Sequence, residues 1–141
     1  MRGVCICFFM VLLGCTAAFA QGSLEVTVEG FDAVKGNVWV GLFTDADNFP
    51  KKADKGKVAE VTGKSVRVVF EGLKPGDYAV SIFHDANGNG EMDKNMFGIP
   101  KEGFGFGNDA MGKFGPPSFD KAKVVVAENE VVRVVVKVKY F

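Results

Sequence analysis

The sequence SVRVVFEGLKPGDYAVSIFHD, residues 65–85, decides the fold class. Apolar side chains recur in it at every second position on both sides of a turn, and they are Val66, Val68 and Phe70, then Tyr78, Val80 and Ile82. A period of two is typical of a strand with one buried face. The four residues KPGD between the two runs favour a tight turn, because proline and glycine adopt the backbone angles that turns require. The segment therefore predicts two strands joined by a short turn.

The same alternation continues outward along the chain. It covers residues 24–28, 38–42, 124–126 and 132–140, and it is weaker over 58–61. Helical periodicity is nearly absent. Seven short strands separated by turns predict an all-β domain, which we expect to be a single seven-stranded antiparallel β-sandwich. The residues expected in its core are Val26, Val28, Val40, Leu42, Val68, Phe70, Tyr78, Val80, Val124, Val134 and Val136.

Residues 86–121 lack a strand pattern and are expected to form one long loop rich in glycine and phenylalanine. Structureless loops beyond about 12 to 15 residues are uncommon in compact domains and are usually functional or disordered. Disorder is not expected here, because the segment carries too much apolar mass. The large apolar residues are Phe97, Ile99, Phe104, Phe106, Phe114 and Phe119. Two interpretations stay open, since these side chains can cover one end of the sandwich as a lid or remain exposed as a binding platform.

The first 20 residues have the layout of a secretory signal peptide. Arg2 precedes an apolar run over residues 4–13, and small residues follow up to Ala20. The run is shorter than the roughly 20 residues that a membrane-spanning helix needs. We expect cleavage after Ala20, a single domain over residues 21–141, and a periplasmic or secreted location. The alternative is a lipid anchor at Cys15, because the sequence LLGC that ends there resembles a lipoprotein processing motif.

Composition limits the classes of partner. All three cysteines, Cys5, Cys7 and Cys15, fall inside the leader, so no disulfide is expected in the mature domain. Removing Arg2 from the 17 basic residues leaves 16, against 17 acidic ones. A near-neutral domain has no excess of positive charge to attract nucleic acid, so we expect no nucleic-acid binding. We also expect no transmembrane span in the mature protein.

The sequence DANGNGEMDKN, which begins at Asp85, spaces its oxygen atoms like a calcium loop. Asp85, Asn87, Asn89 and Asp93 occupy positions 1, 3, 5 and 9, and position 6 is glycine. Glu91 at position 7 would offer its backbone carbonyl. Because all these ligands are hard oxygens, Ca²⁺ is the expected cation. The alternative is that two Asn-Gly pairs simply form tight turns.

The pattern departs from an EF-hand at position 12. An EF-hand has a glutamate there, whereas this chain has Met96. The ligand set would therefore need another member. The candidates are water, Asn95, Glu102, Asn108 and Asp109.

The sequence shows no persuasive catalytic constellation. His84, the only histidine, has no cysteine or nucleophile-elbow serine to act with, and its place in the alternation predicts a core or rim position. Glu102 and Asp109 could imitate the carboxylate pair of a glycosidase. We expect a non-enzymatic binding or structural module of the cell envelope, with an envelope protein or glycan as partner. The alternative is a small envelope enzyme that acts on a glycan or similar substrate.

Two stretches resemble known families. FEGLKPGDYAV, residues 70–80, is similar to the strand-turn-strand motif of transthyretin-like and collagen-adhesin B-type sandwiches. The calcium-like loop, followed by FGIPKEGFGF at 97–106 and GPPSF at 115–119, resembles a bacterial exported family known as domain of unknown function 2141. This second resemblance covers nearly all of residues 21–141. Together they imply an exported sandwich of transthyretin-like or immunoglobulin-like type, and they imply no particular activity.

Overall fold

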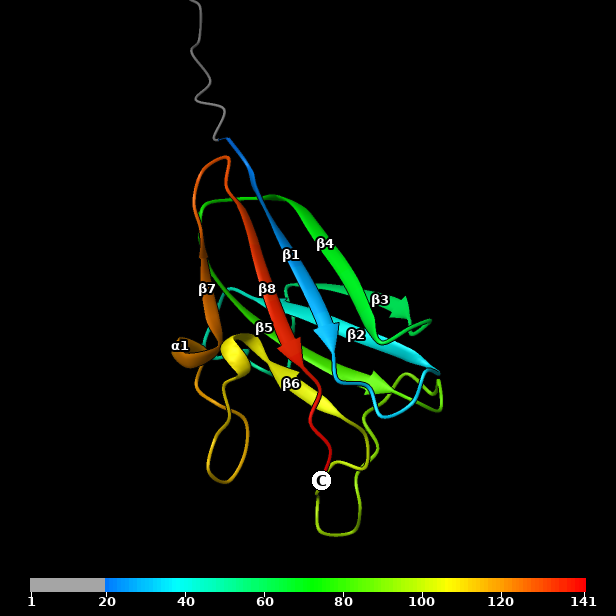
Figure 1. Ribbon diagram of the computed structural model, residues 1–141. Helices are drawn as coiled ribbons and strands as arrows, with labels where there is room; N and C mark the ends of the chain where they lie inside the picture. The colour runs from blue at the N-terminus through cyan, green and yellow to red at the C-terminus, as the bar shows by residue number, and fades with distance from the viewer. Residues whose placement is uncertain (1–19) are drawn as a thin grey trace, which may run out of the picture.

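A computed structural model describes residues 20–141 (Figure 1). Apart from Ala20, the predicted signal peptide and the alternative lipidation site Cys15 lie outside the described residues. The elements are β1 (Gly22–Glu29), β2 (Asn37–Phe43), β3 (Lys55–Glu60), β4 (Ser65–Leu73), β5 (Gly76–Asp85), β6 (Phe104–Phe106), the 3₁₀ helix η1 (Gly107–Asp109), α1 (Phe119–Ala122), β7 (Lys123–Val126) and β8 (Val131–Lys137). The prediction of an all-β domain is confirmed.

Two sheets pack face to face in a sandwich-like arrangement (Figure 1). The first has the order β4-β1-β8, and the second has the order β3-β2-β5-β6. β7 also pairs with β5, along Gly76–Ala79, while β6 pairs with the later part of β5, along Ser81–Phe83. β7 and β6 therefore follow one another along β5.

The expectation of seven antiparallel strands is wrong in two respects. The described residues contain eight strands, and β1 pairs with β8 in parallel, so the smaller sheet is mixed. The seven expected strands are all present, and β6 is the additional one. Alternation identifies the buried face of a strand but not the direction of its neighbour. β1 and β8 come from opposite ends of the domain, so no tight turn forces them to be antiparallel.

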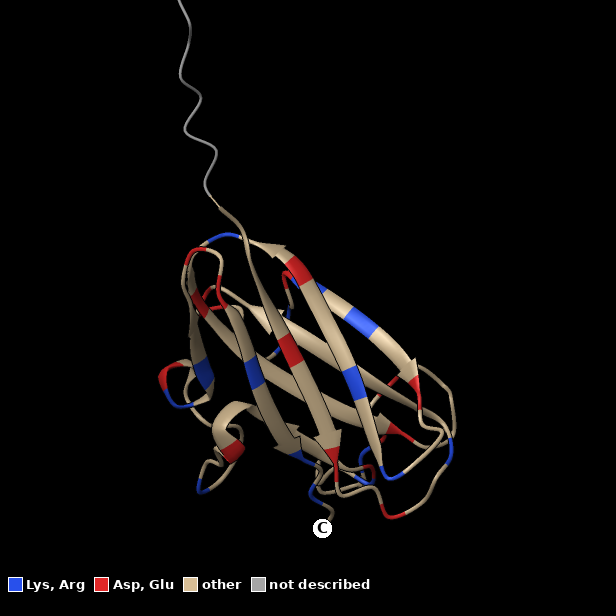
Figure 2. Ribbon diagram, turned by 45° about the horizontal axis from the view of Figure 1, so that its top comes forward, with Lys and Arg blue, Asp and Glu red and all other residues tan. Residues whose placement is uncertain are grey.

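The core lies between the two sheets and is almost entirely aliphatic. Nine of the eleven residues expected there are buried, and the other two, Val124 and Val134, are half-buried against the same cluster. Leu24, Val38 and Leu73 are among the other buried members of this cluster. On the outer face of the smaller sheet, Glu25 lies between Arg67 and Arg133 at 3.5 and 3.8 Å (Figure 2). These exposed ion pairs contribute little stability, so the apolar core holds the sheets together.

The expectation of a structureless loop over residues 86–121 is also wrong, because the segment contains β6, η1 and most of α1. The sequence GFGFG at 103–107 places glycine at every second position. A Cβ on Gly105 would lie 2.7 Å from the Lys137 carbonyl oxygen, and one on Gly107 would lie 2.2 Å from the Ala122 oxygen. Glycine is required on that side because the strand lies directly against neighbouring backbone.

The aromatic rings of this segment divide into packed and exposed groups. Phe106 is buried in a second cluster on the outer face of the larger sheet, with Phe43 and Ala122. Phe49 contacts this cluster edge-on, with ring centroids 5.1 Å from Phe43 and 5.9 Å from Phe106. Phe119 packs at its edge. These rings are therefore packed as the lid interpretation expects, but they cover the outer face of the larger sheet and not one end of the sandwich. The exposed rings lie on two loops described below.

Candidate cation loop and exposed tips at one end of the sandwich

Asp85, the last residue of β5, organises the loop that follows it. Its side chain is only 1% exposed. One carboxylate oxygen accepts the backbone N–H of Asn89 at 3.1 Å, and the other accepts that of Gly90 at 2.8 Å. The Trp39 indole N–H also donates to it, at 3.3 Å. Gly90 has φ +77°, a left-handed conformation that glycine adopts without strain. The loop thus folds back over the end of its own strand.

The other three side chains expected as ligands also meet. The Asn87 and Asn89 side-chain amides donate to the Asp93 carboxylate at 2.5 and 3.0 Å. The oxygens of the two amides accept the backbone N–H groups of Asn89 and Glu91, at 3.2 and 2.9 Å. Such side-chain turns are the alternative that the Asn-Gly pairs suggested. The loop therefore has the spacing of a calcium loop and the internal hydrogen bonds of a turn.

Glu102 reaches this loop from the far end of the intervening segment. It is 8% exposed, and its two carboxylate oxygens accept the backbone N–H groups of Ala86 and Asp93 at 3.1 and 3.3 Å. Of the protein residues considered as a further ligand, Glu102 is the one that the structure brings to the loop. Asn95 closes the next turn, Asn108 donates to the Lys121 and Lys123 carbonyls, and Asp109 accepts from Lys137.

A pocket of about 460 Å³ opens beside Glu102 and Asp93. Its lining residues are Lys35, Ala86, Asn87, Asp93, Lys94, Lys101 and Glu102. Within residues 20–141, no three His, Cys, Asp or Glu side chains are grouped so that they could hold a metal. To bind a cation, the Asn87 and Asn89 amides would have to turn their oxygens inward and release Asp93. The three lysines would further weaken cation binding by repulsion.

His84 is buried next to this site and has a structural environment. Its Nε2 lies 2.7 Å from the Lys35 carbonyl oxygen, which can only accept, so in the neutral ring Nε2 carries the hydrogen. Nδ1 then accepts from the Tyr140 hydroxyl at 2.8 Å. The Phe31 ring packs edge-on at 5.1 Å. The expected core or rim position of His84 is confirmed, and both ring nitrogens are occupied by structural contacts.

The comparisons with known proteins agree with one resemblance drawn from the sequence. A family model described as "Uncharacterized protein conserved in bacteria (DUF2141)" matches residues 26–134. The chain belongs to the DUF2141 family. The match begins in β1 and ends in β8, so it spans both sheets and the loop after Asp85. No significant match was found among curated proteins or among solved structures.

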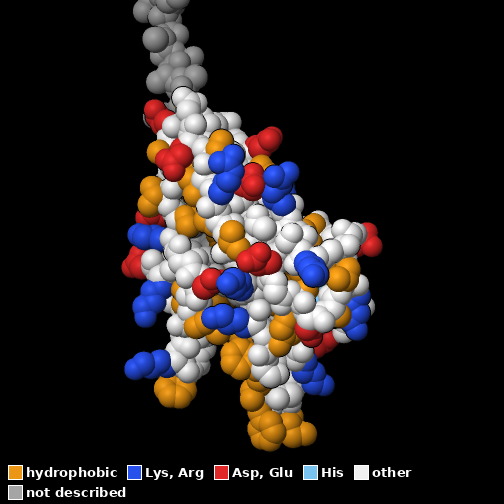
Figure 3. Space-filling view, in the orientation of Figure 1, with side chains coloured by type: hydrophobic (Ala, Val, Ile, Leu, Met, Phe, Trp, Pro, Cys, Tyr) orange, Lys and Arg blue, Asp and Glu red, His pale blue; other side chains and the backbone are white. Residues whose placement is uncertain are grey.

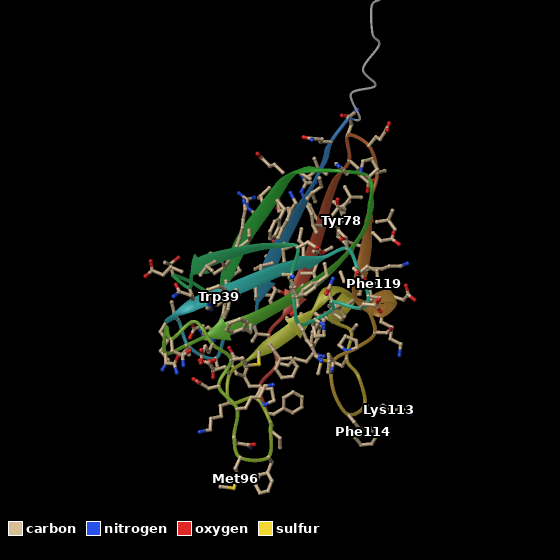
Figure 4. All side chains as sticks on the ribbon, turned by 180° about the vertical axis from the view of Figure 1, so that it is seen from behind. Trp39, Tyr78, Met96, Lys113, Phe114 and Phe119 are labelled. Atoms are coloured by element: carbon tan, nitrogen blue, oxygen red, sulfur yellow. The ribbon has the colours of Figure 1, made fainter. Side chains whose placement is uncertain are left out.

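At the same end of this DUF2141 domain, two loops carry exposed apolar side chains. The first tip, residues 94–101, presents Met96 and Phe97, which are 91% and 80% exposed. The second tip, residues 110–118, presents a fully exposed Phe114. Figure 3 shows both as projections with hydrophobic ends, and Figure 4 shows Met96 and Phe114 at the ends of separate loops. Among residues 20–141, no helix has the length and apolar character needed to cross a membrane.

The two tyrosines of the domain should ionise at a higher pH than free tyrosine. Burial raises the pKa of Tyr140 to about 12, and burial also raises the pKa of Tyr78. Unfolded tyrosine ionises near pH 10, so between about pH 10 and 12 the folded state holds more protons than the unfolded state. The stabilisation is therefore complete below pH 10 and is lost as the pH rises towards 12. We expect near-ultraviolet phenolate absorbance to stay low at pH 10, and Tyr140→Phe to remove the later step. Ionisation of both rings near pH 10 in the folded domain would contradict their burial.

Proposed function

We propose that this DUF2141 domain is an exported, non-enzymatic binding or structural module of the cell envelope, stabilised by a calcium ion in the loop over residues 85–93. The observation that carries the proposal is the meeting of Asp85, Asn87, Asn89 and Asp93 with the buried Glu102 at the end of β5. A calcium ion would draw on the side-chain oxygens of the loop and the Glu91 carbonyl. Its partner would be an envelope protein, glycan or other envelope surface.

Export rests on the leader pattern. A mass spectrum of the exported protein should show an N-terminus at Gln21, and a lipidated Cys15 would place the domain on a membrane anchor instead.

For the finer architecture we propose a transthyretin-like or immunoglobulin-like sandwich. A solved structure with a different arrangement of the sheets would overturn that assignment.

The alternative of a small envelope enzyme would need carboxylates free to act on a substrate. Asp93 and Glu102 line the pocket, but Glu102 uses both oxygens to hold backbone N–H groups and Asp93 accepts from two amides. His84 has no free ring nitrogen. These contacts favour the binding module over the enzyme.

Calcium should raise the melting temperature of the domain. With two loop carboxylates and three nearby lysines, we expect a Kd of about 10⁻⁴ to 10⁻³ M, as in extracellular modules. At a hundredfold excess over Kd, the ion adds about 2.7 kcal/mol to the free energy of unfolding. That corresponds to several degrees for a domain of this size. The measurement is a pair of thermal melts, in millimolar calcium and in chelator.

Asp93→Ala is the sharper variant for this test, because Asp93 is only partly buried and its amide partners are exposed. It should remove the calcium-dependent shift and leave the melt in chelator nearly unchanged. The matched control is Asp45→Ala, since Asp45 accepts from the Asp47 backbone and the Asn48 amide in an exposed turn at the other end of the sheet. This control should keep the full shift. Coincident wild-type curves with and without calcium would overturn the cation site.

A further inference from the structure

The most exposed large apolar side chains of the described residues gather at one end of the molecule. They are Met96, Phe97, Phe114 and the C-terminal Phe141, which is 78% exposed and stacks on Phe104. Large apolar groups that project into water usually mark a contact surface. β1 starts at the opposite end (Figure 1). The exposed rings therefore point away from the place where the domain begins.

The first tip is held in shape by its own hydrogen bonds. The Asn95 side-chain oxygen accepts the backbone N–H groups of Phe97 and Ile99 at 2.9 and 3.0 Å. The Asn95 backbone N–H donates to the Ile99 carbonyl, and its carbonyl accepts from Gly98, both at 2.9 Å. Lys94 and Pro100 form a bridge at the base. Phe97 is thus exposed on a preformed turn whose backbone groups are largely paired.

The second tip is equally narrow. A Cβ on Gly112 would lie 2.3 Å from the Gly115 carbonyl oxygen and 2.6 Å from that of Pro116, so the two sides of the loop touch. Phe114 stands at its end with no side-chain cover. Both tips therefore present single rings on slender turns, whereas a stable protein interface needs roughly 800 Å² per partner of continuous, complementary surface.

Every charged side chain in the two tips is a lysine. Residues 94–101 contain Lys94 and Lys101, and residues 110–118 contain Lys113, without an aspartate or glutamate in either segment. Lys35 joins Lys94 and Lys101 around the pocket at the base of the first tip, so three lysines line it together with Asp93 and Glu102. Apolar tips flanked by basic residues match the interface of an anionic bilayer, in which rings enter the acyl boundary and lysines meet headgroups.

We propose that the two tips dock this domain onto a lipid bilayer with anionic headgroups, Phe97 and Phe114 entering the interface and Lys94, Lys101 and Lys113 contacting phosphates. This deepens the proposed envelope function, on which it rests for its location, by naming a partner surface. It does not require the calcium ion. Both tips are loops that project beyond the ends of the strands, so docking needs no change in the fold.

The test is sedimentation of the purified domain, residues 21–141, with vesicles of phosphatidylglycerol and phosphatidylethanolamine or of phosphatidylcholine alone. Three lysines near the surface predict binding on the order of a hundredfold tighter to the anionic vesicles, decreasing with added salt. Phe97→Ala with Phe114→Ala should weaken anionic-vesicle binding by about tenfold or more. Phe97→Trp should show a blue-shifted emission with vesicles, beyond the background of Trp39, the single native tryptophan.

The matched control is Val125→Ala with Val131→Ala, which removes two exposed apolar side chains away from the tips. It should bind vesicles like the wild type. All variants should have the same melting temperature as the wild type, because none of these side chains is buried. The proposal is overturned if the wild type binds neither kind of vesicle or binds both equally. It is also overturned if the variant with both Phe97→Ala and Phe114→Ala binds anionic vesicles as well as the wild type. Capture of an envelope protein by the tips, with no vesicle binding, would also overturn it. Repeating the assay in chelator separates this result from failure of the calcium site.

Discussion

Replacing Phe106 by alanine should lower the free energy of unfolding by about 3 to 5 kcal/mol, as for other core phenylalanines. Phe106 is buried between the outer face of the larger sheet and the segment that covers it. Its ring meets Phe49 and Phe104, each with a centroid separation of 5.9 Å. Removing it leaves a cavity in the second cluster and weakens the hold on the short strand β6. Chemical denaturation followed by circular dichroism measures the loss.

Phe114→Ala is the matched control for Phe106→Ala. The two residues lie eight positions apart in the same segment, but Phe114 is fully exposed, so its substitution should change stability by less than about 0.5 kcal/mol. Phe104 is half-buried, so the loss of stability in Phe104→Ala should lie between those of Phe106→Ala and Phe114→Ala. If Phe106→Ala and Phe114→Ala were equally mild, the second aromatic cluster would not be a packed core.

The strands that the sequence predicts well are those with one buried and one exposed face. Val26 and Val28 in β1, or Val80 and Ile82 in β5, alternate because every second side chain enters the space between the sheets. The burial of apolar side chains on one face is therefore visible directly in the sequence as this alternation. The turn residues Lys74 and Pro75 then separate β4 from β5.

β6 escaped prediction because its alternation is one of glycine with phenylalanine. Gly103 and Gly105 occupy the positions where a strand normally shows valine or leucine. A Cβ on Gly105 would collide with the end of β8, and one on Gly103 would collide with the residues that follow β8. The C-terminal residues pair with β6 through Phe104 and Lys139. The period of two was present in GFGFG, but only a search for spacing regardless of hydrophobicity would have found it. The parallel pairing of β1 with β8 had no local signal.

The sequence located the polar residues of the loop after β5 but not the way in which the loop packs. The pattern located Asp85, Asn87, Asn89 and Asp93, which the structure brings together. It could not distinguish Glu102 from Asn108 or Asp109, because the fold decides which distant residue returns to the loop. Tyr140, which contacts His84 from 56 positions away, gave no signal beyond its place in the last alternating segment.

Asp85→Ala should lower the free energy of unfolding by about 3 kcal/mol even in chelator, which separates its structural role from any role as a ligand. The substitution leaves the Gly90 backbone N–H and the Trp39 indole N–H without their acceptor, at a position 1% exposed. The Asn89 backbone N–H loses one of its two acceptors and keeps the Asn87 side-chain oxygen. Asp93→Ala, at the partly exposed side of the same loop, should lower the free energy of unfolding only slightly under the same conditions. Chemical denaturation in chelator measures the difference, and the Trp39 indole proton in an NMR spectrum reports the local change. An Asp85→Ala domain as stable as the wild type in chelator would mean that the loop does not depend on this carboxylate for its shape.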